Sequence, residues 1–108
     1  MNFVVGTDNG SVALFNGAKL LKTKQLSGVS SMVGYYNGQI VAAVANGSLT
    51  VLNQDLGIIR KFHGIDGLDA RSISGNDTYL ALGDEEGLVR YYDRKGGAEP
   101  NVSLLLVL

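Results

Sequence analysis

The chain has 108 residues, of which 45% are hydrophobic and 18% are charged, and nine Lys and Arg balance ten Asp and Glu. This length allows one domain, and the apolar content excludes an intrinsically disordered chain. With a net charge of −1, no cysteine and one histidine, the sequence disfavours nucleic-acid binding and any thiolate or multi-histidine metal site, and we expect no cofactor.

The two ends of the sequence bear on localisation. The first residues, Met1 to Val5, carry no positively charged segment, so they do not resemble a signal peptide. The apolar stretch at the other end, Leu104 to Leu108, is far shorter than the ~18 residues of a membrane span. We therefore expect a soluble, cytoplasmic protein that does not bind membranes.

Short aliphatic and β-branched runs separated by glycine are typical of a turn-rich all-β protein, and Gly occurs 15 times. In chain order, strands are predicted within 4–16, 19–26, 29–36, 41–53, 56–62, 68–74, 80–93 and 102–106, where the three longest ranges each hold two strands and a turn. Four Asn-Gly pairs begin at Asn9, Asn16, Asn37 and Asn46. This dipeptide favours a type I′ hairpin turn, which needs positive φ at both central residues.

The sequence repeats itself. The pattern Asn-Gly-Ser-aliphatic-x-aliphatic-apolar-Asn, first found at 9–16, recurs at 46–53, a shift of 37 positions (46 − 9). A third, more divergent copy ends at Asp93, which lies 40 positions after Asn53 (93 − 53). Three copies of a strand–turn–strand unit at this spacing predict a β-propeller built of four-stranded antiparallel blades.

Residues 68–93 resemble one repeat of the WD-repeat β-propeller family. Ile73-Ser74-Gly75-Asn76-Asp77 lies in the family's Ser-Pro-Asp-Gly region and Leu80-Ala81-Leu82-Gly83 in the following strand. Glu86-Gly87 matches the Asp-Gly turn, and Tyr91-Tyr92-Asp93 replaces the terminal Val-Trp-Asp. No Trp-Asp pair is present, and His63-Gly64 reverses the family's Gly-His, so we expect the family's buried His–Ser/Thr–Asp–Trp network to be absent or incomplete.

This interpretation assigns residues 1–27 to a first blade that lacks its innermost strand, 28–66 to a second blade and 67–108 to a third. A propeller needs four to eight blades, so 108 residues supply an incomplete ring with two uncovered apolar faces. We therefore expect the ring to be completed by other protein, which is either further copies of the chain or the rest of a larger propeller.

The candidate site residues lie in or near positions that the family resemblance places on the top face of the blades: Asp84, Glu85, Arg71 and Asp66. As part of the turn between two strands, Asp84 and Glu85 could equally be solvated residues without a role. Arg71 replaces a usually buried aliphatic residue, so it either faces the central channel or is exposed by a register slip. We expect a structural or exposed role for His63.

The resemblance implies a non-catalytic scaffold for protein–protein interaction. The alternative is a self-assembling propeller that binds a small ligand or carbohydrate in equivalent pockets between blades. An enzyme is not expected, because the sequence contains no nucleophile motif, phosphate loop or metal-ligand spacing.

Overall fold

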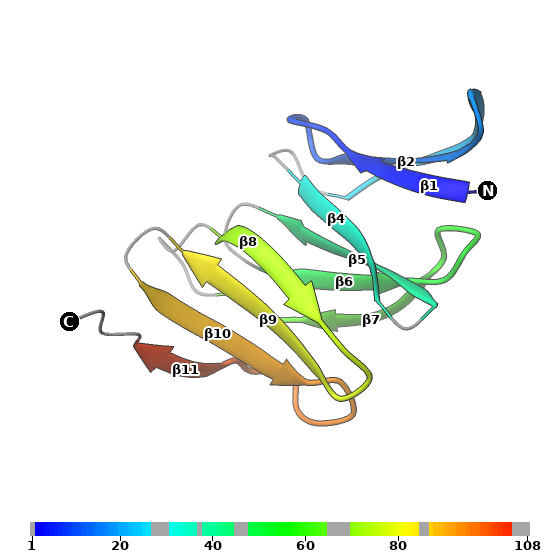
Figure 1. Ribbon diagram of the computed structural model, residues 1–108. Helices are drawn as coiled ribbons and strands as arrows, with labels where there is room; N and C mark the ends of the chain where they lie inside the picture. Colours follow the sequence, from blue (N-terminus) through cyan, green and yellow to red (C-terminus); the bar gives the residue numbers. More distant parts are fainter. Residues whose placement is uncertain are drawn as a thin grey trace.

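The computed structural model of the chain describes residues 2–26, 31–36, 38–44, 48–64, 70–84 and 87–104 (Figure 1). The described residues form strands and turns, and none of them belongs to a helix that could cross a membrane. The strands are arranged in three antiparallel sheets, in each of which consecutive strands are neighbours.

Sheet 1 consists of β1 (Asn2–Gly6), β2 (Ser11–Asn16) and β3 (Lys19–Gln25). Sheet 2 consists of β4 (Ser31–Tyr36), β5 (Gln39–Val44), β6 (Leu49–Leu52) and β7 (Ile58–Phe62). Sheet 3 consists of β8 (Ala70–Gly75), β9 (Tyr79–Asp84), β10 (Leu88–Asp93) and β11 (Asn101–Leu104). The predicted all-β class with four-stranded antiparallel sheets is confirmed by sheets 2 and 3, whereas sheet 1 has three strands in the described residues.

The three sheets are stacked in chain order, with sheet 2 between the other two (Figure 1). Strand β4 contacts both β1 and β8, so the first strand of each sheet lies on one side of the stack. The outer strands β7 and β11 lie on the other side (Figure 1). The ring that such stacking begins is not closed by the described residues.

Sheet 2 is buried on both faces because it lies between sheets 1 and 3. Successive side chains of its strands point to opposite faces and so pack against different sheets. One face packs against sheet 1 in a cluster of Val12, Leu14, Ile40, Ala42, Leu52 and Leu56. The other face packs against sheet 3 in a cluster of Val41, Ala43, Leu49, Val51, Phe62, Leu80, Leu82 and Tyr92. The continuous apolar run of β5 therefore reflects a strand that is covered twice.

The internal repeat is also visible in the strand pairing. The β2–β3 ladder has an irregularity between Leu14 and Phe15, and the β6–β7 ladder has one between Val51 and Leu52. These positions are related by the same 37-residue shift as the sequence repeat (51 − 14). Equivalent residues of the first two copies therefore occupy equivalent places in sheets 1 and 2.

The expected type I′ turns are wrong at Asn9 and Asn16. Among the described residues, the non-glycine residue with positive φ is Leu56, so at these two Asn-Gly pairs only the glycine adopts a left-handed conformation. The amide of Gly10 donates to the carbonyl of Thr7 (3.1 Å), which forms a turn one residue longer than predicted. Asn9 instead uses its side-chain oxygen to accept a hydrogen bond from the Ser11 amide (3.3 Å). Asn37 and Asn46 lie outside the described residues.

Candidate functional site

Of the predicted site residues, Arg71 and Asp84 lie in the described part of the chain, at one end of the stack that we call the turn end. It contains the β1–β2 turn, Thr7–Gly10, and the segment where β9 ends at Asp84 and β10 begins at Leu88. The start of β8 also lies here, because Ala70 pairs with Asp84. In Figure 1 the turn end is on the left of sheet 3.

Asp84 is half-buried at the end of β9. Its carboxylate oxygen Oδ1 accepts a hydrogen bond from the backbone N–H of Leu88 (3.0 Å) and so ties the end of β9 to the beginning of β10. Gly87, just before Leu88, has a φ of 85°, a conformation that glycine adopts without steric cost. Asp84 therefore holds the β9–β10 turn in addition to any role toward a partner.

Arg71 is exposed and lies in an irregularity of the β8–β9 ladder, between Ala70 and Ser72. A bulged residue lies outside the regular alternation of a strand, and it redirects its side chain away from the pleat. Of the two explanations for an arginine here, exposure by a register slip is the one that the ladder supports. Because Ala70 pairs with Asp84, Arg71 and Asp84 lie on adjoining strands. Glu85 and Asp66 lie outside the described residues.

A cleft of about 220 Å³ opens near the turn end between sheets 1 and 2. Gln25 and Leu26 at the end of β3 form one wall, and Thr50, Lys61 and His63 contribute to the other. The cleft is thus lined by both apolar and polar side chains, and Lys61 adds a positive charge to it. Lys61 was not singled out from the sequence, because only the pairing of β6 with β7 places it beside the cleft.

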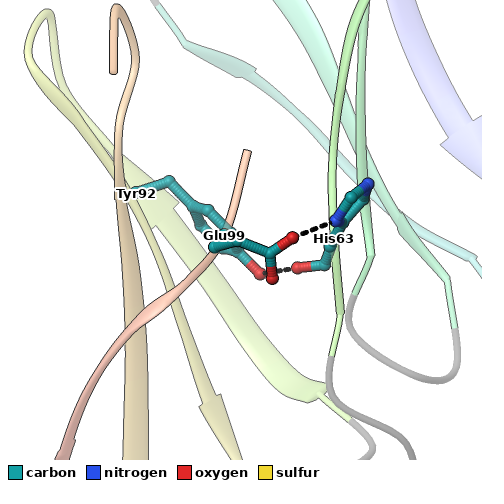
Figure 2. Close-up of polar contacts among 3 residues, drawn as sticks. All are labelled: His63, Tyr92 and Glu99. Carbon is teal, nitrogen blue, oxygen red and sulfur yellow. Dashed lines mark hydrogen bonds and ion pairs between the residues drawn. The ribbon is translucent and has the colours of Figure 1, made fainter. Parts of the chain in front are cut away.

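His63 links sheet 2 to the segment that precedes β11 (Figure 2). Its ring nitrogen Nδ1 pairs with the carboxylate of Glu99, and its backbone carbonyl accepts a hydrogen bond from the Tyr92 hydroxyl. The His63 amide also donates to the carbonyl of Ala98 (2.8 Å). His63 is exposed and joins two sheets, a geometry that fits the structural or exposed role expected from the sequence.

Tyr92 is fully buried, and its ring lies 5.0 Å from that of Phe62 across the junction of sheets 2 and 3. Burial raises the pKa of the Tyr92 phenol above its usual value of 10.0, because desolvation disfavours the phenolate. The charge of Arg90 opposes this increase in pKa, and the carboxylate of Glu99 adds to it. Tyr92 is therefore a neutral hydrogen-bond donor at ordinary pH.

A smaller cavity of about 100 Å³ lies between sheets 2 and 3 and is lined by Arg60 and Arg94 among others. The Arg94 guanidinium donates to the Tyr36 carbonyl (3.3 Å), the Gln39 side chain (2.6 Å) and the Asn76 carbonyl (3.2 Å). The Arg60 guanidinium donates to the carbonyls of Arg94 (3.0 Å) and Gly96. Both arginines thereby join sheet 2 to sheet 3 through neutral acceptors.

The two cavities are not equivalent. The larger one is lined by Lys61 and His63 and the smaller one by Arg60 and Arg94, so neighbouring side chains of β7 serve different junctions. These two cavities therefore do not share a set of equivalent lining residues. In the described part of the chain, no three His, Asp or Glu side chains come together as a metal site would require.

No protein-family model and no curated protein matches the chain. Among solved structures, it is similar to the WD40 β-propeller domain of Doa1, with 17% identity and a TM-score of 0.69 over 83% of this chain. It is also similar to BamB from Moraxella catarrhalis, with 15% identity and a TM-score of 0.76 over 96% of this chain. A chain of the mitotic checkpoint complex matches with 14% identity and a TM-score of 0.76 over 93% of this chain.

The chain spans 32% of the length of each of these three proteins. Identities of 14–17% carry information on the fold alone. Together with the stacked meander sheets, they show that the chain is built from β-propeller blades and that its described residues do not close a ring.

Proposed function

We propose that the chain is a non-catalytic scaffold for protein–protein interaction, built of WD-repeat-like propeller blades. The blades correspond to residues 1–27, 28–66 and 67–108, and the ring is completed by other protein. The observation that supports this proposal is that Arg71 and Asp84 lie on adjoining strands at the turn end of sheet 3. Opposite charges held by a packed framework suit recognition of a polar protein surface.

The family resemblance supports the same end of the blades as the binding face. Within this proposal, Glu85 and Asp66, which lie outside the described residues, are further candidates for partner binding. Arginine is enriched among residues that dominate binding energy, because its planar guanidinium forms several hydrogen bonds at once. Arg71, which is exposed, is therefore the first residue to test.

The test compares proteins that co-purify with the wild-type chain and with two variants, Arg71→Glu and Asp84→Asn. The second variant removes the charge of Asp84 but keeps an oxygen that can accept from the Leu88 amide, so the β9–β10 turn is preserved. We expect both variants to lose the same partner while their circular dichroism stays that of the wild type.

The matched control is Asp77→Lys, which changes an exposed charge in the β8–β9 turn at the opposite end of sheet 3. It should keep the partner. If Arg71→Glu and Asp84→Asn retain every partner that the control retains, the turn end is not the binding face and the site assignment is wrong.

A further inference from the structure

Sheets 1 and 3 each have one face that no described residue of the stack covers. On sheet 1, Val12 and Leu14 face sheet 2, so the alternating residues Ala13 and Phe15 face away from it. Phe3 pairs with Phe15 and Val5 with Ala13, so they share this open face. The rings of Phe3 and Phe15 are stacked with centroids 5.2 Å apart, and Phe3 is 45% exposed.

The open face of sheet 1, defined by Phe3, Val5, Ala13, Phe15 and Leu20, is uncharged. The three lysines of β3 pair with residues of the opposite face: Lys19 with Asn16, Lys22 with Leu14, and Lys24 with Val12. Leu20 pairs with Phe15 on the open side and is 52% exposed. In a sheet with one face in solvent, charged side chains ordinarily lie on the solvent face. In sheet 1 the lysines lie on the face toward sheet 2, and the open face is apolar.

The repeat identifies the equivalent face in the other sheets. A shift of 37 positions converts Phe3, Val5 and Phe15 into Ile40, Ala42 and Leu52, which face sheet 1 and are fully buried. A further shift of 40 positions converts these into Leu80, Leu82 and Tyr92, which face sheet 2 and are also buried. The three sheets therefore have equivalent faces, and those of sheets 2 and 3 pack against the preceding sheet. Among the described residues, nothing packs against the equivalent face of sheet 1.

The same shifts identify the faces that act as covers. Val12 and Leu14 of sheet 1 cover sheet 2, and their equivalents Leu49 and Val51 cover sheet 3. The next members of this series are Val89 and Tyr91 on sheet 3. These two point away from sheet 2, because Arg90 and Tyr92 of the same strand are buried and Tyr92 faces sheet 2.

The aromatic and aliphatic residues of the open face of sheet 3 are Tyr79, Ala81, Val89 and Tyr91, and we define the open face by these four. The strand pairing places the polar residues Ser72, Ser74, Asn101 and Ser103 on the same side. The rings of Tyr79 and Tyr91 meet edge to face at 6.2 Å, and both side chains are partly exposed. Asp93 at the end of β10 turns its carboxylate to the Lys95 amide (2.9 Å). The described residues thus include one face that none of them covers, on sheet 1, and one face that covers none of them, on sheet 3.

We infer that a second copy of the chain covers the open face of sheet 1 with its open face of sheet 3, and reciprocally. Two copies supply six sheets, which is within the range of four to eight blades in closed propellers, whereas three copies would supply nine. The contact joins two different surfaces and closes after two copies. This inference rests on the proposed function, because it supplies the ring that the scaffold needs.

The test uses the oppositely charged variants Val5→Lys, on the open face of sheet 1, and Tyr91→Glu, on the open face of sheet 3. Native mass is measured by light scattering during size-exclusion chromatography. The wild type is expected at twice 11.4 kDa. Each variant alone places an unpaired charge in both contacts and should weaken dimerisation by at least about 100-fold.

An equimolar mixture of the two variants should recover the dimer. The mixed ring has one contact between two unaltered faces and one in which Lys meets Glu. Ile59→Lys is the matched control, since Ile59 is 51% exposed on β7 and belongs to neither open face. Circular dichroism checks folding, and Leu20→Lys and Tyr79→Glu replace any variant that does not fold.

Four results would overturn the inference: a monomeric wild type at 100-fold the working concentration, a dimer of either variant alone, a mixture that stays monomeric, or dissociation of the Ile59→Lys control. A dimer of Tyr91→Glu alone would indicate contact between two copies of the sheet 1 face. Because Arg71→Glu lies outside both open faces, its native mass should equal that of the wild type. Loss of partner binding in that variant therefore reports on the proposed function and not on the ring.

Discussion

Replacing Phe62 with alanine tests whether sheets 2 and 3 are packed as blades. Phe62 ends β7 and is 1% exposed, and its ring contacts Tyr92 of sheet 3 with centroids 5.0 Å apart. The guanidinium carbon of Arg60 lies 4.3 Å from the Phe62 ring centre. Phe62 therefore connects the apolar cluster of the two sheets with the arginine contacts beside it.

The expected loss of unfolding free energy has three sources. Removing a buried phenylalanine side chain costs about 3–5 kcal/mol, which includes the cavity that remains. Within this range, the tilted ring pair accounts for about 0.5–1.5 kcal/mol and the cation–π contact for about 0.5–1 kcal/mol. We expect a total near the upper end, because Phe62 takes part in all three interactions.

Urea unfolding followed by circular dichroism measures the loss, at one protein concentration because association adds to apparent stability. Ile59→Ala on the same strand is the control and should cost less than about 1 kcal/mol, since that side chain is half-exposed. If Phe62→Ala is unfolded at zero urea, the smaller change Phe62→Leu shows whether the free energy of unfolding decreases. Equal losses for Phe62→Ala and Ile59→Ala would refute the packing of sheets 2 and 3.

Three further predictions concern polar and backbone features. Burial raises the pKa of Tyr92 above 10.0, so the stability that the neutral phenol gives the folded state is fully present below about pH 10 and is lost as the pH rises through the folded-state pKa. The free energy of unfolding should therefore fall more steeply with pH above about 10 for the wild type than for Tyr92→Phe. Equal slopes would contradict this. Arg94→Gln should lower the urea midpoint by the equivalent of about 1–3 kcal/mol, because its donors to sheets 2 and 3 are lost, whereas the exposed neighbour variant Lys95→Gln should leave it unchanged. Leu56 is buried with a φ of 63°, so Leu56→Gly should be more stable than Leu56→Ala by about 1 kcal/mol; the opposite order, measured by thermal unfolding, would exclude strain at this residue.

Strand positions could be predicted because period-two patterns and glycine spacing are local signals. The predicted strand 29–36 corresponds to β4 at Ser31–Tyr36, and 68–74 corresponds to β8 at Ala70–Gly75. The repeat added information of longer range, since it required each copy to pack in the same way. The proposed blade limits at 27 and 66 stay predictions, because they lie outside the described residues.

The side-chain contacts between sheets could not be predicted. Arg60 reaches the carbonyls of Arg94 and Gly96, more than thirty positions away, and nothing in the local sequence of β7 indicates this. Glu99 likewise becomes a partner of His63 only because the segment before β11 returns past β7. The turn at Asn9 was assigned incorrectly because Asn-Gly favours, but does not impose, a two-residue turn, and Thr7 offered a competing hydrogen bond.

Residue-resolved amide hydrogen exchange tests the stacking of the three sheets most directly. Strands β2, β5 and β9 are each paired on both edges, but only β5 has both faces covered by described residues. In protein dilute enough to be monomeric, the amides of β5 are therefore expected to exchange more slowly than those of β2 and β9, each of which has one face that no described residue covers. Raising the protein concentration should slow exchange in β2 and β9 and leave β5 unchanged. If β2 or β9 exchanges as slowly as β5 at a concentration where light scattering shows only the monomer, the stacked-blade account is contradicted.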